Sequence, residues 1–311
     1  MNYITVDGGT TNTRISILRG HNIISTKKYS VGVGNDKEKK LKSVLKSGIC
    51  DLLEKTELAA SDIECILVSG AITSEMGIVW LKHISAPCGI DEIAESLHFM
   101  NLDDIAPIKF AFVPGVKMPG DNYEDVDMMR GEETELIGLC DKLREDTLYV
   151  LPGTHSKHIS VDKDGRIFNI STEFTGEIIS AVSKNTVLNT SIDLSSSKID
   201  EKYLKEGYEY ACNNGINSAF FKVRVLAVML GRDNNCASSF FIGASLADEI
   251  QNIIKSPQKR VIIGGRYELK RPMSILLKEN TSKEIVELSD ETGDTAAAYG
   301  LVKIYEYRVS K

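Results

Sequence analysis

The fold is decided by the stretch Val6-Asp7-Gly8-Gly9-Thr10-Thr11-Asn12-Thr13-Arg14, which lies between two apolar segments. Residues 3–6 predict a strand that ends at Asp7, and residues 15–18 predict the strand that returns beside it. Glycine allows the tight turn, and the turn carries hydroxyl groups next to one carboxylate. Main-chain amides and oxygen ligands together make this hairpin a candidate for holding a phosphate group and its metal ion.

A second stretch of the same kind occurs in the other half of the chain. It reads Val150-Leu151-Pro152-Gly153-Thr154-His155-Ser156-Lys157, and it also lies between apolar segments. Each hairpin is followed by a polar turn and a third predicted strand. The repetition predicts two related α/β domains that face one ligand, and we place them at residues 1–145 and 146–311. An ordinary hairpin with glycine in the turn is the alternative for either stretch taken alone.

Length and charge limit the class of protein. With 311 residues the chain can form two domains, because single cores stop growing near about 250 residues. The net charge of −7 argues against nucleic acid and against a membrane surface as partners, since both attract basic proteins. Six scattered cysteines without a Cys-x-x-Cys pair indicate neither a zinc site nor a disulfide framework. No signal segment or long apolar run is seen, so we expect a cytoplasmic protein.

Hydrophobic periodicity predicts the main helices. We expect them at residues 37–53, 91–97, 178–187, 218–230, 238–254 and 292–307, with another that starts at Asp127. The helix at 91–97 would begin at an acidic cap, Asp91. The serine-rich residues 189–201 predict a linker.

Two further segments carry polar or glycine-rich sequence after predicted strands. Residues 65–68 lead into Gly70-Ala71-Ile72-Thr73-Ser74-Glu75-Met76-Gly77, and ligands of open α/β sheets bind at such strand ends. Residues 259–263 lead into Gly264-Gly265, where an adenosine could approach the main chain closely. A plain turn is the alternative for the two glycines.

Several of these motifs together resemble the 2-dehydro-3-deoxygalactonokinase family, within the superfamily of sugar kinases, heat-shock ATPases and actin. The specific strings are Met129-Arg130-Gly131-Glu132-Glu133-Thr134 and Leu151-Pro152-Gly153-Thr154-His155-Ser156-Lys157, joined by Ala86-Pro87-Cys88-Gly89 and Phe174-Thr175-Gly176-Glu177. The resemblance implies two actin-like (ribonuclease H-like) domains with a cleft between them and the last helix at the hinge. It also implies ATP-dependent phosphorylation of 2-dehydro-3-deoxy-D-galactonate on its terminal hydroxyl, with ATP and Mg²⁺ as cofactors.

Phosphoryl transfer requires in-line positioning, neutralisation of phosphate charge and a base for the attacking hydroxyl. For the base we choose Asp127, by analogy with sugar kinases whose catalytic aspartate precedes a helix of the first domain. A helix cap is the alternative role, and Asp125, Glu132 and Glu133 are rival bases. Asp7 is placed to hold Mg²⁺ through water.

The remaining residues are assigned to ligand groups. The phosphates and nucleotide would be bound by the two hairpins and the late glycines: Gly8, Gly9, Thr10, Thr11, Asn12, Arg14, Gly153, Thr154, His155, Ser156, Lys157, Gly264 and Gly265. The sugar acid would be bound by Ser74, Glu75, Arg130, Glu132, Glu133, Thr175 and Glu177, with the guanidinium of Arg130 on the carboxylate. An ion pair of Arg130 with Glu132 or Glu133 is the alternative, and Arg14 and Lys157 could instead be solvated.

Two other functions stay open at this point. One is a related kinase acting on a different sugar acid or on a small hydroxy acid such as pantothenate. The other is a non-catalytic, nucleotide-dependent sensor or scaffold, because the same fold serves chaperones and filaments. The sequence leaves a homodimer open as well. A dinucleotide-binding oxidoreductase is disfavoured, since no Gly-x-Gly-x-x-Gly follows the first strand.

Overall fold

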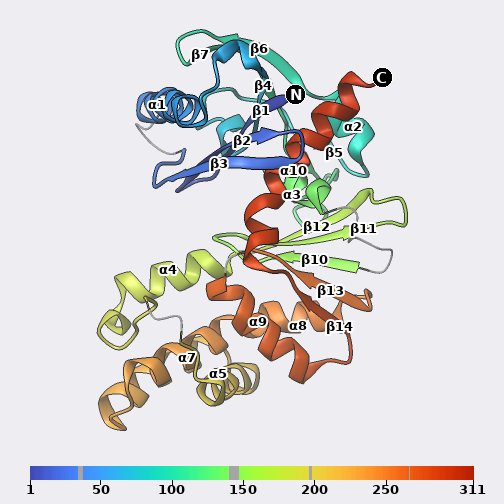
Figure 1. Cartoon of the computed structure of the whole chain (residues 1–311). Coiled ribbons are helices and arrows are strands. Elements are labelled where there is room, and N and C mark those ends of the chain that lie inside the picture. Colours follow the sequence, from blue (N-terminus) through green and yellow to red (C-terminus); the bar gives the residue numbers. More distant parts are fainter. Residues whose placement is uncertain (34–37, 140–146, 196–197, 266) are drawn as a thin grey trace. The chain divides into compact units, whose positions relative to one another are not determined.

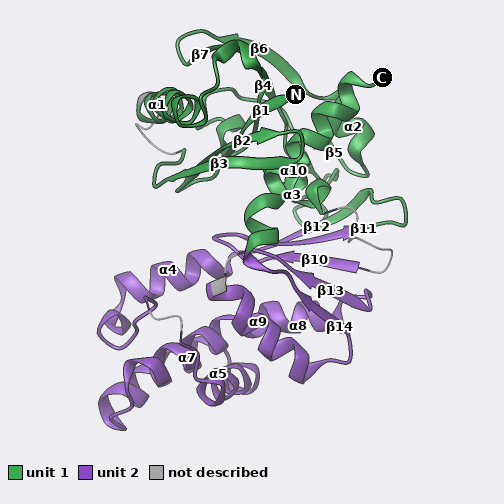
Figure 2. Ribbon diagram, in the orientation of Figure 1, with its two compact units in different colours: residues 1–145, 161–170, 291–311 green, residues 146–160, 171–290 purple. Residues whose placement is uncertain are grey.

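The computed structural model describes residues 1–33, 38–139, 147–195, 198–265 and 267–311. The chain forms two compact units (Figure 2). Unit 1 consists of Met1–Glu145, Val161–Ile170 and Glu291–Lys311, and unit 2 consists of Asp146–Ser160 and Ser171–Asp290. The domain boundary expected between residues 145 and 146 lies outside the described residues. Two later segments of the chain, residues 161–170 and 291–311, belong to unit 1.

Unit 1 is built on a six-stranded sheet in the order β3-β2-β1-β4-β7-β6. The strands are β1 (Asn2–Gly8), β2 (Thr13–Arg19), β3 (Asn22–Tyr29), β4 (Ile63–Gly70), β6 (His98–Leu102) and β7 (Ala106–Phe112). Strands β1, β2 and β3 form consecutive antiparallel hairpins, and β4 runs parallel to β1. The predicted hairpin at Asp7–Arg14 is therefore confirmed, with Gly8 paired to Thr13.

Both faces of this sheet are covered by helices (Figure 1). On one face, apolar residues of α1 (Glu38–Thr56) at helical spacing, such as Leu41, Leu45 and Ile49, pack with Ile4 and Val6 of β1. On the other face, Tyr3 meets Tyr305 of α10 (Asp290–Val309) edge-on, with ring centroids 5.7 Å apart. The alternation along β1 thus turns even-numbered residues to α1 and odd-numbered residues to α10.

Unit 1 also contains smaller elements. They are the 3₁₀ turns Ala60–Asp62 and Ala71–Thr73, the helices α2 (Ile90–Glu95) and α3 (Glu132–Gly138), and the short strands β5 (Ile84–Ser85), β8 (Val116–Lys117) and β9 (Met128–Met129). The last three form a second sheet in the order β5-β8-β9.

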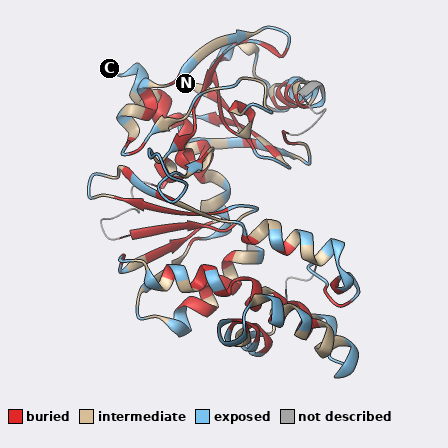
Figure 3. Ribbon diagram, turned by 180° about the vertical axis from the view of Figure 1, so that it is seen from behind, coloured by how far each residue is buried: buried red, intermediate tan, exposed pale blue. Residues whose placement is uncertain are grey.

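The pattern is repeated in a five-stranded sheet in the order β12-β11-β10-β13-β14, which lies mainly in unit 2; Val161 of β11 and residues 167–170 of β12 belong to unit 1. The strands are β10 (Thr147–Leu151), β11 (Ser156–Val161), β12 (Ile167–Glu173), β13 (Arg260–Ile263) and β14 (Glu284–Glu287). As in unit 1, an antiparallel hairpin is joined to a strand that runs parallel to its first member. The two related α/β domains expected from the repeated hairpin are confirmed, and Figure 3 shows the central strands of both sheets largely buried.

The helices of unit 2 form its second layer. They are α4 (Thr175–Asn185), α5 (Glu201–Asn214), α6 (Ile216–Arg224), α7 (Asn234–Ser245), α8 (Ala247–Lys255) and α9 (Tyr267–Asn280), with a 3₁₀ turn at Val187–Thr190 and a π-helical turn at Val225–Met229. Helices α5 and α7 cross with their main chains in contact: a Cβ at Gly207 would lie 2.1 Å from the carbonyl oxygen of Phe240. No helix among the described residues is long and apolar enough to cross a membrane.

Three of the helix predictions need correction. No helix begins at Asp127, because Met128 and Met129 pair with β8 and Gly131 has a φ of 113°, so α3 starts only at Glu132. The helix expected at 238–254 is divided at Leu246; the Ser245 hydroxyl donates to the carbonyl of Phe241, a contact that bends helices.

Helix α2 does not begin at the expected acidic cap, and three further elements lie where hydrophobic periodicity did not predict them. Gly89 rather than Asp91 caps α2, and its amide donates to Glu92 Oε2 at 2.8 Å. Helices α5 and α9 and strand β14 were not predicted from the sequence. Pro272 lies inside α9, where a proline normally argues against a helix.

The crossing of α3 and α10 in unit 1 has no room for side chains. A Cβ at Gly300 would lie 1.7 Å from the carbonyl oxygen of Thr134, and a Cβ at Gly138 would lie 1.9 Å from that of Ala296. Because each clash is with main chain rather than with a flexible side chain, neither can be relieved by a rotamer change.

We therefore expect Gly300→Ala to lower the free energy of unfolding by at least about 2 kcal/mol, since overpacking against main chain must separate the helices. Chemical denaturation would measure the change. Ser47→Ala on the exposed side of α1 is the control and should stay within about 0.5 kcal/mol of the wild type. An unchanged midpoint for Gly300→Ala would contradict the described helix crossing.

Candidate active site

The first hairpin of unit 1 exposes the groups expected to bind phosphate. The amide of Gly9 donates to the carbonyl of Asn12 at 2.8 Å and closes the turn, which leaves Thr10 and Thr11 exposed at its tip. The carbonyl of Gly9 accepts from the amide of Val33 at 3.2 Å. The turn is thereby supported from behind while its hydroxyls face solvent.

Three glycines bring separate motifs of unit 1 together behind this hairpin. Gly8 pairs with Gly70 in the sheet, and a Cβ on Gly70 would lie 2.5 Å from the carbonyl oxygen of Gly8. A Cβ on Gly131 would in turn lie 3.1 Å from Cα of Gly70. Gly70 and Gly131 both have positive φ, at 87° and 113°. The hairpin, the segment that follows β4 and the start of α3 therefore meet at one place.

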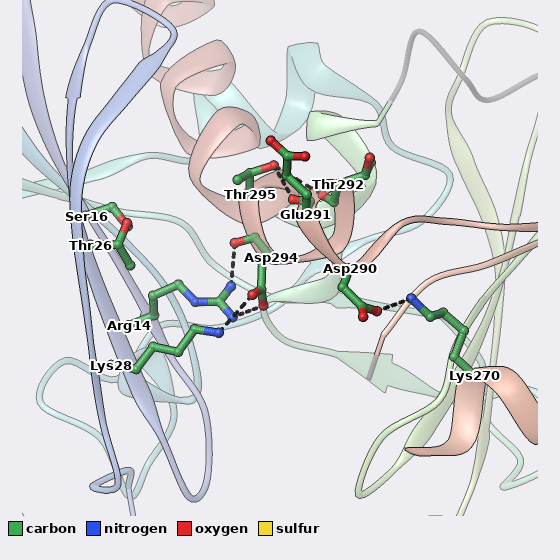
Figure 4. A network of polar contacts seen from close by, with 10 residues as sticks. All are labelled: Arg14, Ser16, Thr26, Lys28, Lys270, Asp290, Glu291, Thr292, Asp294 and Thr295. Carbon is green, nitrogen blue, oxygen red and sulfur yellow. Dashed lines mark hydrogen bonds and ion pairs between the residues drawn. The ribbon is translucent and has the colours of Figure 1, made fainter. Parts of the chain in front are cut away.

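A row of polar side chains crosses the sheet beside the hairpin. The register pairs Asp7 with Arg14, Arg14 with Lys28, and Asp7 with Ser69, so all four lie on the face covered by α10. Arg14 and Lys28 both contact Asp294 of α10 (Figure 4). In this structure the guanidinium expected to meet phosphate is thus engaged by a carboxylate of the same unit.

The second hairpin is held in the same way by main-chain contacts within unit 2. The amide of Glu177, in the first turn of α4, donates to the carbonyl of Thr154 at 2.9 Å. A Cβ at Gly176 would lie 1.9 Å from the carbonyl oxygen of Gly153, and one at Gly265 would lie 2.5 Å from that of Pro152. The hairpin, the start of α4 and the exit of β13 are therefore in direct contact, with Thr154 and His155 exposed.

Two residues of the second hairpin have other partners than the ones expected. Ser156 is buried and donates to Glu249 of α8, which also contacts His158 Nε2 at 3.0 Å. Lys157 is buried as well, and its Nζ donates to Thr172 at 2.7 Å. Strand alternation explains the difference, because Ser156 and His158 lie on the face toward α8. In this structure neither Ser156 nor Lys157 exposes its side chain.

Arg130 is held by the segment that follows β4. Its Nη1 donates to the carbonyl and the hydroxyl of Thr73, both at 2.7 Å, and its Nη2 donates to the carbonyl of Leu81 at 3.0 Å and contacts the ring of His83. The guanidinium thereby fixes the loop that carries Ser74 and exposed Glu75. The hydrogen bonds found for the guanidinium among the described residues thus go to this segment, and binding of the substrate carboxylate by Arg130 stays a prediction.

The two glutamates after Gly131 differ in surroundings. Glu132 is half-buried, and its Oε2 accepts from the main-chain amide of Arg130 at 2.8 Å. Glu133 is fully buried, and its carboxyl group accepts from the amide of Gly131 at 2.8 Å. Burial raises the pKa of Glu133 to about 8, and the charge of Glu132 adds to the rise. Glu133 is therefore mainly protonated at neutral pH and has no exposed surface in this structure.

Asp127 lies outside these buried contacts. It is half-buried at the entry to β9, where its Oδ1 accepts from the amide of Met128 at 2.6 Å and its carbonyl accepts from Met118. Because α3 begins only at Glu132, Asp127 is not the cap of that helix.

Two predicted site residues of unit 2 come together, because Glu177 Oε2 lies 3.9 Å from His155 Nε2, and the ring of Phe174 stacks on His155. Unit 2 also contains a hollow of about 480 Å³, lined by residues 198–201, Asn235 and, on α9, Arg271 and Ile275. The sequence analysis missed this hollow and, in unit 1, Lys28 and Asp294. Strand alternation after Arg14 would have indicated Lys28, whereas nothing local indicates Asp294.

A metal ion would have few protein ligands here. No group of three or more His, Cys, Asp and Glu side chains that could hold a metal is found in the described part of the chain. Asp7 stands half-buried at the end of β1 beside the hydroxyls of the first hairpin. A single carboxylate fits Mg²⁺, which usually keeps several waters and takes substrate phosphates as further ligands.

Two units, each with a β-hairpin joined to a parallel strand and each exposing a glycine-hydroxyl turn, define the class of actin-like ATPases and sugar kinases. Two solved structures share the fold. One, from Sinorhizobium meliloti, is provisionally named a 2-dehydro-3-deoxygalactonokinase; its TM-score is 0.80 at 21% identity, covering 98% of this chain and 96% of that one. The other is the activator of 2-hydroxyisocaproyl-CoA dehydratase from Clostridium difficile with bound ADPNP, with a TM-score of 0.57 at 14% identity, covering 100% and 96%.

The sequence gives the family itself. The chain belongs to the 2-keto-3-deoxy-galactonokinase family, whose model matches residues 7–304. A curated relative, the 2-dehydro-3-deoxygalactonokinase of Escherichia coli, is 26% identical over 252 residues, which cover 81% of this chain and 80% of that protein. The resemblance seen in the motifs around Arg130 and Gly153 is confirmed.

The raised pKa of Glu133 predicts a pH-dependent stability. Between its ordinary value of 4.5 and its folded value of about 8, the folded state binds the proton more tightly than the unfolded state does. The free energy of unfolding should therefore fall as pH rises through this window, by at most about 1.4 kcal/mol per pH unit from this group. Glu133→Gln should remove that contribution, as measured by urea denaturation at a series of pH values. The exposed Glu54→Gln is the control, and a Glu133→Gln profile parallel to the wild type would disprove the prediction.

Proposed function

We propose that the chain is a kinase that transfers the γ-phosphoryl group of ATP to the terminal C6 hydroxyl of 2-dehydro-3-deoxy-D-galactonate and forms the 6-phosphate. The observation that carries the proposal is the match of the family model to residues 7–304. That match spans both hairpins, so the residues proposed for the nucleotide and those proposed for the sugar acid lie within one family pattern.

The paired hairpins support ATP as the phosphoryl donor. Each turn exposes a main-chain segment and a hydroxyl, at Thr10 and Thr11 in unit 1 and at Thr154 in unit 2. Such groups bind phosphate oxygens in other nucleotide sites. The structurally similar dehydratase activator was solved with ADPNP, an ATP analogue. We assign the adenosine to unit 2 beside Gly264 and Gly265, because the main chain at Gly265 lies directly against Pro152 of the second hairpin.

Asp7 is the proposed Mg²⁺ residue. When bound, the ion would neutralise phosphate charge and orient the γ-phosphoryl group for in-line attack. The protein's own part is to hold the Asp7 carboxylate at the end of β1, next to the hydroxyls of the first hairpin.

For the base, we keep Asp127 as the proposal. Of the acidic residues considered, Glu133 is fully buried and mainly protonated, and Glu132 is bound to the amide of Arg130. Asp127 is partly accessible, and its Oδ1 accepts a hydrogen bond from the amide of Met128. A carboxylate in that state can take a proton from a primary hydroxyl. We infer that Arg130 mainly positions the loop that carries Ser74 and Glu75. The proposed contacts to the sugar acid are the side chains of Ser74, Glu75, Thr175 and Glu177.

The function is tested by coupled ADP release from the wild-type protein with ATP, Mg²⁺ and one acceptor at a time. We expect ADP release with 2-dehydro-3-deoxygalactonate and slower release with its gluconate epimer. Turnover with only another sugar acid or a hydroxy acid would support a related kinase. Nucleotide binding without turnover of any acceptor would support a sensor or scaffold.

The base is tested by Asp127→Asn, which keeps the size of the side chain and removes its basic oxygen. We expect kcat to fall by about 10²- to 10⁴-fold while the KM for the sugar acid changes little. Asp125→Asn, at an exposed carboxylate two residues earlier, is the control and should turn over normally. Nearly normal turnover of Asp127→Asn would reassign the base, and a loss confined to Asp125→Asn would assign it to that rival.

A further inference from the structure

Arg14 and Lys28 are neighbouring cations that share one anionic partner, all within unit 1. Arg14 Nη1 donates to the main-chain carbonyl of Asp294 at 2.5 Å, and its Nη2 donates to Asp294 Oδ1. Lys28 Nζ donates to Asp294 Oδ2 at 2.9 Å. Figure 4 shows both cations of the sheet directed at this one residue of α10. Both carboxylate oxygens of Asp294 are thus used to neutralise the pair.

The cation pair lies next to the first hairpin. Arg14 is two residues beyond Asn12 and stands directly opposite Asp7 in the sheet, with Lys28 on the next strand. Side chains directly opposite each other on antiparallel strands have Cβ atoms about 5 Å apart. A polyphosphate held by the hairpin and by Asp7 would therefore bring its oxygens within reach of the same two cations.

The contact with Asp294 leaves part of the guanidinium unsatisfied. Nε of Arg14 is buried, and no hydrogen-bond acceptor for it is found among the described residues. A carboxylate offers two oxygens, both already used, whereas a polyphosphate offers more oxygens and more negative charge. The side chain of Asp294 is 51% exposed, so its release would cost little.

Asp294 is itself an anion. Partial burial alone would raise the pKa of its carboxyl group, but the hydrogen bond from Lys28 and the charge of Arg14 lower it below its ordinary value. The cation pair therefore carries a charged occupant at neutral pH.

We propose that Asp294 acts as a tethered anion that occupies the Arg14–Lys28 pair until the phosphates of the nucleotide displace it. The idea rests on the proposed function, because it takes the first hairpin as a polyphosphate site. Its consequence is that Asp294 weakens polyphosphate binding in the wild-type protein. A side chain with a purely structural role would instead support binding. The direction in which Asp294→Asn changes the affinity therefore distinguishes a competing anion from a structural residue.

The test is calorimetric titration of the full chain with inorganic tripolyphosphate and with ATP and Mg²⁺. We expect Asp294→Asn to bind tripolyphosphate about three- to tenfold more tightly than the wild type, because a competing charge is removed. Asp51→Asn is the matched control. Asp51, on α1, pairs at 2.6 Å with Lys27, the neighbour of Lys28 on β3. Its side chain is as exposed as that of Asp294 and carries the same charge. That control should leave the affinity unchanged.

A second comparison keeps the result independent of general effects on folding. In an Arg14→Ala/Lys28→Ala background, Asp294→Asn should bring no gain, since both cations that it occupies are gone. Unchanged or weaker binding by Asp294→Asn, or an equal gain from Asp51→Asn, would overturn the inference while leaving the kinase proposal intact. A wild-type protein that binds neither tripolyphosphate nor ATP would overturn the nucleotide site itself, and the inference with it.

Discussion

Close contact between main chains is the constraint on which both units depend. In unit 1 the contacts run from Gly8 through Gly70 to Gly131, and in unit 2 Gly176 and Gly265 lie against the second hairpin. At Gly70, Gly176 and Gly265 a single added methyl group would overlap a carbonyl oxygen, so only glycine is compatible with the geometry there. These contacts place the hairpins, and the hairpins expose the amides and hydroxyls on which the proposed phosphate chemistry relies.

The polar residues of the motifs divide into two groups. Thr10, Thr11 and Thr154 face solvent and remain available to a ligand. Ser156, Lys157 and the guanidinium of Arg130 hold parts of the protein in place through hydrogen bonds at normal or short distances. Buried polar groups need partners, because leaving one unpaired costs roughly 1–3 kcal/mol. Such residues fix the position of a loop or the register of a strand independently of the ligand.

Sequence patterns were sufficient where the information is local. The turn at Gly8–Asn12, the repeated hairpin at Gly153 and the long C-terminal helix follow from glycine positions and hydrophobic periodicity. Sequence patterns failed where the conformation depends on pairing with residues distant in the sequence. The local sequence predicts that a helix includes Met128 and Met129, but they form strand β9, which pairs with β8. Ser156 reads as a phosphate donor, but the alternation of β11 turns it toward Glu249.

The sequence by itself determined the two-unit α/β architecture and the family, because turns, strand alternation and motif strings are properties of neighbouring residues. Only the tertiary structure decided which polar side chains face a ligand and which are held by the protein. Arg14 illustrates the reason: its partner Asp294 comes from a helix at the other end of the chain, and no local pattern specifies such a contact. Likewise, the elevated pKa of Glu133 arises from burial, which depends on everything packed around it.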